Sequence, residues 1–178
     1  MPMISEEDLR KRMLEAVATA ARYCVAVENA RETDKETFVR EMTACLPRLY
    51  TEFAEVPAED VMADELSLGL SYVDEDYYES IRRRVETLLG PDDTYLETFE
   101  EDMKYSDTPI AASVAEGLAD IFQDLYNFAT RVKESEGLAL ESAFAECREN
   151  FDAYWSRTLC NVMRPLNAMR IERPAADD

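Results

Sequence analysis

The chain has 178 residues, of which 47% are hydrophobic and 33% charged, and its formal net charge at pH 7 is −20. This length and composition are typical of one globular domain with a sizeable core rather than of a disordered chain. A charge this negative argues against binding to anionic lipid or to nucleic-acid phosphates. We therefore expect neither a membrane nor a nucleic acid as a partner.

The N-terminal part of the chain predicts two helices. The first covers about Glu6 to Asn29, with Ser5 as its cap and an apolar stripe at helical spacing. Its acidic start is unlike a signal peptide, and its longest charge-free stretch is far shorter than the roughly 20 apolar residues of a membrane span. The second helix begins after Thr33, in a second capping box, and contains Pro47, which should kink it.

The middle of the chain is less regular. We interpret residues 56–73 as a connecting loop, although residues 66–73 alternate in polarity as a strand does. A helix over about Glu75 to Leu89 ends at Gly90-Pro91, because a glycine followed by a proline is a common helix stop. A further helix is predicted from about Asp93 to Met103.

Two long helices follow. Thr108-Pro109 starts the clearest one, in which apolar residues recur every three or four positions until Gly137 ends it. The last helix runs from about Ala139 to Ile171, with a kink expected at Pro165.

Together these elements predict the fold class. Six helices with short links, and only four glycines, are typical of an all-α bundle. We expect a single helical domain over residues 1–173 and a disordered tail over residues 174–178.

The residue types that are scarce narrow the chemistry. The chain has no histidine, which is the usual general base near neutral pH and the commonest transition-metal ligand. No Cys-x-x-Cys pair occurs, and we expect buried free thiols and hence a reducing cytoplasm. We find no catalytic motif and expect no metal or cofactor. The cysteines are Cys24, Cys45, Cys147 and Cys160.

Charge is distributed unevenly along the chain. Residues 52–79 hold ten acidic side chains and no basic one, and residues 92–124 hold ten acidic side chains and one lysine. Residues 147–173 are the reverse, with five arginines against three acids. Such an asymmetry concerns partners and solubility more than chemistry. It predicts acidic faces that suit a basic protein partner, and it fits equally a protein whose charge only keeps it soluble.

One set of carboxylates resembles a metal site. Glu97 and Glu100 form a Glu-x-x-Glu pair, and Glu116 and Asp120 lie one turn apart on the next long helix. All-helical nucleotide pyrophosphatases of the MazG type use a similar pattern, in which the second pair is one residue closer. A helical wheel places Glu116 and Asp120 opposite the apolar stripe. A solvated face is therefore the stronger interpretation, and a Mg²⁺-dependent phosphohydrolase is the alternative.

A second polar set lies at the edge of the apolar stripes of the two long helices. An arginine at such an edge lays its stem on apolar surface and its head group on a carboxylate. We expect a structural ion pair between Asp124 and Arg157, and keep a small anionic-ligand site as the alternative. The residues of this candidate binding site are Asp124, Asn150, Trp155, Arg157, Asn161 and Arg164.

Four segments carry a family resemblance: Gly90–Leu96, Asp102–Asp107, Leu118–Leu125 and Glu149–Trp155. In this order they resemble a bacterial family of small all-helical proteins classed as a domain of unknown function. The resemblance spans residues 23–169 and implies an all-helical cytosolic protein, without an established activity.

The sequence thus favours a non-enzymatic, acidic, cytoplasmic interaction protein. An adaptor, an inhibitor or an immunity-type protein that presents acidic faces to a basic partner fits the charge. The hydrolase alternative requires Glu97, Glu100, Glu116 and Asp120 to converge on one cavity. Neither the identity of a partner nor the oligomeric state follows from the sequence.

Overall fold

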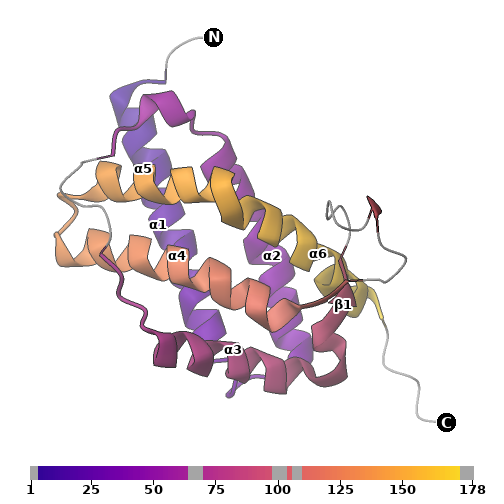
Figure 1. Ribbon diagram of the computed structural model, residues 1–178. Helices are drawn as coiled ribbons and strands as arrows, with labels where there is room; N and C mark the ends of the chain where they lie inside the picture. Colours follow the sequence, from indigo (N-terminus) through magenta and orange to yellow (C-terminus); the bar gives the residue numbers. More distant parts are fainter. Residues whose placement is uncertain (1–3, 64–69, 98–103, 106–109, 173–178) are drawn as a thin grey trace.

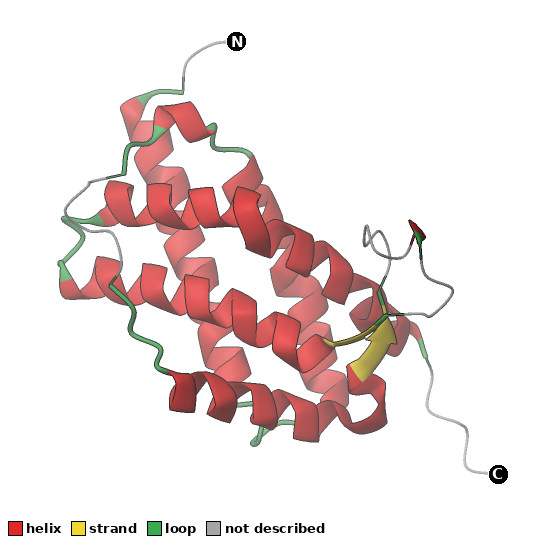
Figure 2. Ribbon diagram, in the orientation of Figure 1, coloured by secondary structure: helices red, strands yellow, loops and turns green. Residues whose placement is uncertain are grey.

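The computed structural model describes residues 4–63, 70–97, 104–105 and 110–172, and these ranges form an all-α bundle with one small sheet (Figures 1 and 2). The predicted fold class is therefore confirmed. The helices are α1 (Glu6–Glu28), α2 (Lys35–Ala54), α3 (Glu75–Leu89), α4 (Val114–Glu134), α5 (Leu140–Asn150) and α6 (Ser156–Ile171); the strands are β1 (Thr94–Leu96) and β2 (Ala111–Ser113).

Helix α4 is the centre of the arrangement. It packs against α1, α3, α5 and α6, while α2 contacts α1 and α6. In Figure 1, α1 and α2 lie behind, and α3, α4 and the continuous α5–α6 run lie in front of them. The bundle therefore has two layers, and α4 shares apolar contacts with both.

An aromatic cluster fills the core between the two layers. The ring of Phe53 stacks on Phe144 with centroids 4.9 Å apart, and Trp155 meets Phe53 edge-on at the same distance. Phe128 and Phe151 complete the contacts around Phe53. Such offset and edge-to-face pairs add to the stabilisation from burial alone. The cluster joins α2, α4, α5 and the α5–α6 connection.

Side-chain caps define where the helices begin. Ser5 caps α1 as predicted, its Oγ accepting from the Asp8 amide at 3.1 Å. The cap of α2 is Asp34, one residue after the predicted Thr33, and its carboxylate accepts from the Thr37 amide at 2.8 Å. A capping oxygen satisfies one of the amide groups that a helix start leaves without a partner.

The predicted helix from Asp93 to Met103 is wrong where the structure describes it. Gly90, at φ +58°, turns the chain after α3, and Thr94–Leu96 then pairs antiparallel with Ala111–Ser113. The reason is non-local, because the partner strand lies far along the chain. Residues 98–103 are outside the described ranges.

The start of α4 also differs from the prediction. Helix α4 begins at Val114, not at Thr108-Pro109, which lies outside the described residues. Ser113 is the cap, and its hydroxyl accepts from the Glu116 amide at 3.1 Å. Pairing with β1 keeps Ala111–Ser113 extended. The helix therefore starts at Val114, although the apolar residues at helical spacing begin at Ile110.

The last long helix is nearly the predicted one. Helices α5 and α6 are joined by one π-helical turn, Phe151–Trp155, so that the run from Leu140 to Ile171 is continuous. Pro47 and Pro165 lie inside α2 and α6, which continue past them. A π turn inserts an extra residue and shifts the helix faces that follow it.

Several remaining predictions concern loops and thiols. The described part of residues 56–73 is loop apart from one 3₁₀ turn, Ala58–Asp60, while the alternating segment and the predicted tail fall mostly outside the described residues. All four cysteines are free, as predicted, but Cys160 is exposed rather than buried. Within the described residues, no helix is long and apolar enough to cross a membrane.

Candidate functional site

The two acidic stretches of the sequence meet at one hollow between α3, α4 and the small sheet. Its volume is about 510 Å³. Glu79 comes from the first stretch, Asp93 and Glu116 from the second, and Glu86 stands between them on α3. We call this hollow the acidic cleft; its lining is Tyr78, Glu79, Arg82, Glu86, Asp93, Thr94, Ala111, Ala112, Ser113 and Glu116.

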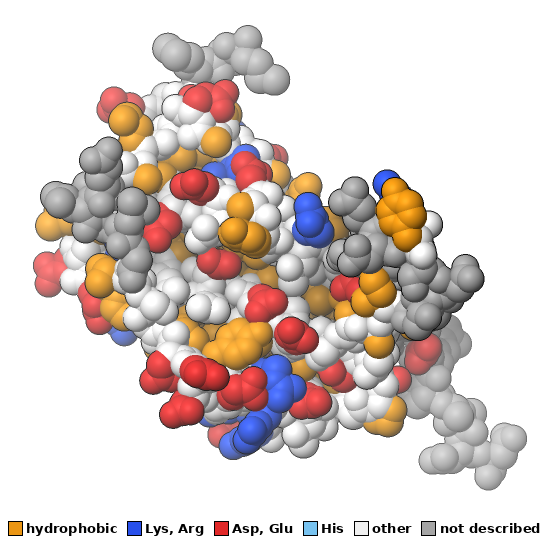
Figure 3. Space-filling view, in the orientation of Figure 1, with side chains coloured by type: hydrophobic (Ala, Val, Ile, Leu, Met, Phe, Trp, Pro, Cys, Tyr) orange, Lys and Arg blue, Asp and Glu red, His pale blue; other side chains and the backbone are white. Residues whose placement is uncertain are grey.

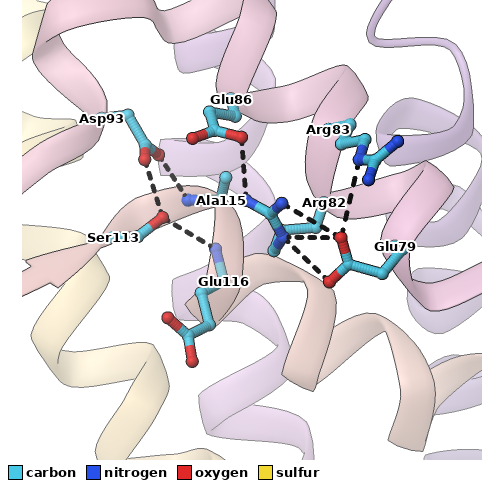
Figure 4. Close-up of polar contacts among 8 residues, drawn as sticks. All are labelled: Glu79, Arg82, Arg83, Glu86, Asp93, Ser113, Ala115 and Glu116. Carbon is cyan, nitrogen blue, oxygen red and sulfur yellow. Dashed lines mark hydrogen bonds and ion pairs between the residues drawn. The ribbon is translucent and has the colours of Figure 1, made fainter. Parts of the chain in front are cut away.

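One wall of the acidic cleft is a network around Arg82 (Figure 4). Arg82 Nη2 donates to Glu79 Oε2 at 3.0 Å, and Nη1 donates to Glu86 Oε2 at 2.8 Å. Arg83 Nε lies 3.6 Å from the same Glu79 oxygen. These hydrogen bonds, those from Arg82 first, lower the pKa of the Glu79 carboxyl below its usual value. Arg82, the only base among the described residues of the lining, is thus already engaged by carboxylates of its own helix, α3.

The opposite wall is built by Asp93. Its buried carboxylate accepts from the Ser113 hydroxyl at 2.7 Å and from the Ala115 amide at 2.6 Å. These bonds fix the turn after α3 to the start of α4 (Figure 4). A carboxylate at a helix start also interacts favourably with the helix dipole. Asp93 therefore has a structural role at one end of the cleft.

Glu116 is the carboxylate of the cleft that remains available. Its backbone amide is bonded to Ser113, but no described residue forms a hydrogen bond or an ion pair with its carboxylate (Figure 4). One turn further along α4, Asp120 is exposed and accepts from the Tyr78 hydroxyl at 2.6 Å. Burial first, and then this bond to Asp120, raises the pKa of Tyr78. Tyr78 therefore stays protonated and remains a donor at neutral pH.

Acidic side chains gather over the face of the molecule that carries α3 and α4 (Figure 3). Beyond Asp120, the face continues into a second hollow of about 380 Å³ between α4 and the α5–α6 run. Tyr154, which is 72% exposed, stands at this hollow beside Asp120 and Asp124. A row of carboxylates thus runs along α4 with one hollow on each side.

The carboxylates of the predicted Mg²⁺ site do not form a metal-binding group among the described residues. Glu116 and Asp120 are exposed on α4, as the helical wheel predicts. Glu97 Oε1 accepts from the Tyr95 hydroxyl at 3.2 Å, and Glu100 lies outside the described residues. In the part of the chain that the structure describes, no three acidic, cysteine or histidine residues are placed to hold a metal ion. The geometry of the described residues therefore does not favour the hydrolase.

The predicted binding residues are only partly brought together. Asp124 is half-buried, and its Oδ1 accepts from Asn150 Nδ2 at 3.0 Å. Burial raises the pKa of the Asp124 carboxyl to about 6, and the bond from Asn150 opposes this shift. Asp124, Trp155 and Arg157 line the second hollow, whereas Asn161 and Arg164 lie further along α6.

The ion pair expected between Asp124 and Arg157 does not form among the described contacts. Helices α4 and α5 are instead joined by Arg131, whose Nη1 donates to Glu146 Oε2 at 2.8 Å. In this pair the arginine comes from α4 and the carboxylate from α5, whereas the sequence predicts the carboxylate on the earlier helix and the arginine on the last one. Arg157 is exposed, while Trp155 is a core residue that donates from Nε1 to the Cys147 carbonyl at 3.2 Å.

The sequence interpretation missed the α3 side of the cleft. Glu79, Arg82 and Glu86 are spaced three and four residues apart, which is the spacing of neighbours on one helix face. That signal was available in the sequence. What the sequence could not show is that this face of α3 meets Glu116 and Asp93 across the α3–α4 contact.

Comparisons with known proteins agree with the predicted resemblance. The chain belongs to the family described as a domain of unknown function, DUF5063, whose model matches residues 7–172. It is similar in structure to protein BF1032 from Bacteroides fragilis, with a TM-score of 0.76 and 29% identity, over 93% of this chain and 96% of that one. No curated protein matches the chain.

Proposed function

We propose that this member of the DUF5063 family is a non-enzymatic binding protein that offers the acidic face of α3 and α4 to a basic segment of a partner protein. The observation that carries the proposal is the convergence of both acidic stretches on one open hollow. Four carboxylates and a single guanidinium line it, and that guanidinium is held by two of the carboxylates. An added cation is therefore the complement that this surface lacks.

The chemistry of the cleft suits a lysine or arginine side chain. Glu116 lines the hollow, and its carboxylate has no hydrogen bond or ion pair from any described residue. Charge-assisted hydrogen bonds from a guanidinium to carboxylates are among the strongest polar contacts. Tyr154 at the neighbouring hollow offers an exposed aromatic ring, on which a second cation of the partner can stack. The predicted binding residues Asp124 and Arg157 border the same surface.

The expected affinity is electrostatic in character. Charges across such an interface raise the association rate and favour partners of opposite charge. Because exposed charges are screened over about 8 Å at physiological ionic strength, binding should weaken as salt is added. This behaviour separates specific docking from apolar adhesion.

The test is affinity capture from a bacterial lysate with a matched pair of variants. Glu116→Gln with Asp120→Asn neutralises two charges on the acidic face. Glu59→Gln with Asp60→Asn neutralises two exposed charges on the turn before residue 61, away from the cleft. Captured proteins are identified and quantified by mass spectrometry at low and at physiological salt.

We expect the parent and the Glu59/Asp60 variant to capture the same basic proteins, and we expect the Glu116/Asp120 variant to lose them. If both variants capture the same proteins in the same amounts, the acidic face does not bind a partner and its charge serves solubility. Retention that does not change with salt would also contradict the proposal.

A further inference from the structure

The outer surface of α1 and α2 carries a second hollow, distinct from the acidic cleft. Its volume is about 570 Å³. These two helices form the rear layer of the bundle, whereas the acidic face belongs to α3 and α4 (Figure 1). We call this hollow the α1–α2 groove. A volume of this size falls in the range of small-molecule sites, about 300–1,000 Å³.

The floor of the α1–α2 groove is apolar. Val25, which is 57% exposed, and Ala26 come from α1, and Met42 and Cys45 come from α2. The core stripe of α1 lies on its other side, so Val25 is not needed for packing within the bundle. Met42 and Cys45 are buried, so the exposed apolar surface of the groove is that of Val25 and the neighbouring alanines, and such a surface is the kind that an apolar ligand covers.

Two arginines stand at one end of this floor. Arg22 of α1 and Arg48 of α2 both line the groove, and the other end is lined by Asn29 and Glu41. About two helical turns separate Arg22 from Asn29, and the same distance separates Arg48 from Glu41. The groove is therefore about 10 Å long. The groove is therefore apolar in the middle and cationic at one end.

Neither guanidinium forms an ion pair within the described part of the chain, although both act at longer range on Glu52, where their charge opposes the rise in the pKa of its carboxyl. Within these residues, no carboxylate lies within ion-pair distance of Arg22 or Arg48. Glu52 follows Arg48 by one turn on α2, and its Oε1 accepts from the Thr19 hydroxyl at 2.8 Å. Glu41 lines the other end of the groove, so among the described residues the end that holds the two arginines offers neither of them an ion-pair partner and suits an anion from outside.

We propose that the α1–α2 groove binds an amphiphilic anion, with an apolar body on the Val25–Met42 floor and a carboxylate or phosphate head between Arg22 and Arg48. Guanidinium groups match both head groups through paired hydrogen bonds. The net charge of the protein does not prevent this, because distant acids are screened over about 8 Å at physiological ionic strength.

The test is calorimetric titration of the full chain with decanoate and with decyl phosphate. Both should bind, and the tighter of the two identifies the head group. Acetate, which lacks the apolar body, and decyltrimethylammonium, whose head is cationic, should bind at least tenfold more weakly. Equal binding of decanoate and decyltrimethylammonium would show adhesion of the tail alone and overturn the proposal.

Variants locate the site. Arg22→Gln with Arg48→Gln should weaken decanoate binding at least tenfold, and so should Val25→Asp, which places a carboxylate on the floor. The control, Arg10→Gln with Arg31→Gln, removes two exposed arginines outside the groove and should bind as the parent does. All these side chains are exposed, and melting temperatures near that of the parent confirm folding.

The remaining outcomes are equally decisive. If decanoate binds all variants alike, it binds elsewhere and the proposal fails. If sedimentation shows a dimer that Val25→Asp dissociates, and the parent does not bind decanoate, a second copy of the chain covers the groove instead. Loss of decanoate binding in both the Arg22/Arg48 variant and Val25→Asp, with the control unchanged, supports the proposal.

Discussion

The inner and outer sides of α4 differ in their contacts: the inner side is packed against other helices, and the outer side faces solvent. On the inner side, Leu118 and Phe122 are fully buried, and the helix approaches α6 so closely at Gly117 that a Cβ there would require Val162 to shift. On the outer side, Glu116 and Asp120 are exposed, and only Asp120 is bonded to another side chain. The inner side depends on close packing, so a change of side-chain volume there should lower the free energy of unfolding strongly. The outer side consists of exposed carboxylates, and substitutions there should alter the binding of a partner far more than stability.

The largest expected effect is on the inner side. Phe122→Ala removes a fully buried ring that packs against Tyr77 and Tyr126. Because the site cannot collapse around the lost ring, the free energy of unfolding should fall by about 3–5 kcal/mol. Chemical denaturation measures this loss. Tyr154→Ala, on an exposed ring, is the control and should change little; a Phe122→Ala protein as stable as the parent would contradict the packing described.

At the boundary between the two sides, a substitution should stabilise the protein. The pKa of Asp124 is raised to about 6 by burial, so the folded protein holds a proton on this group that the unfolded chain has released. Stability from this group is present at low pH and is lost as pH rises from about 4 through about 6. Asp124→Asn removes that loss and keeps an oxygen to accept from Asn150.

The expected gain for Asp124→Asn at pH 7.5 is about 3 kcal/mol, because the pKa of Asp124 in the folded protein, about 6, lies well above its ordinary value of 3.8. At pH 4 the parent and the variant should be equally stable. Chemical denaturation of both proteins at each pH gives the difference in their free energies of unfolding. The contributions of the other titrating groups cancel in this difference because both proteins contain them. A variant that is less stable than the parent at pH 7.5 would show that the Asp124 charge is needed.

A smaller effect is expected where α4 touches α6. A Cβ at Gly117 would lie 2.6 Å from Val162 Cγ1 and 3.2 Å from Thr158 Cγ2. Overpacking of this kind costs about 1–3 kcal/mol, and the better helix propensity of alanine returns about 1 kcal/mol. Gly117→Ala should therefore destabilise by about 1 kcal/mol. Combined with Val162→Ala it should cost less than the two single changes added, and strict additivity would argue against the contact.

The sequence predicted the parts of this fold that depend on local patterns. The stripe and the Ser5 cap of α1 are local, and the structure contains both. Thr94–Leu96 was misassigned because a partner strand at residues 111–113 overrides its helical pattern. No window of neighbouring residues contains that information, since strand pairing is decided by tertiary contact.

The expected ion pair between Asp124 and Arg157 is absent among the described contacts for a related reason. A helical wheel placed Asp124 and Arg157 at the edges of their stripes, but it could not decide which neighbour each would meet. The π turn at Phe151–Trp155 shifts the faces of α6 relative to α5, so one wheel cannot describe both. Asn150, before the turn, reaches Asp124, and Arg157, after it, forms no ion pair with Asp124.

The smallest expected change in stability is on the outer side. Glu116 and Asp120 are like charges one turn apart, a pairing that destabilises a helix by about 0.2–0.5 kcal/mol. Glu116→Gln with Asp120→Asn removes this repulsion, and the new amide oxygen at position 120 can still accept from Tyr78. The free energy of unfolding should therefore stay within about 0.5 kcal/mol of the parent, and any rise should shrink in high salt because salt already screens the parent. Denaturation at low and high ionic strength measures both effects. A loss of stability above about 1 kcal/mol would mean that these carboxylates hold the fold, and the acidic face would then resemble the inner side of α4 rather than a surface free to bind a partner.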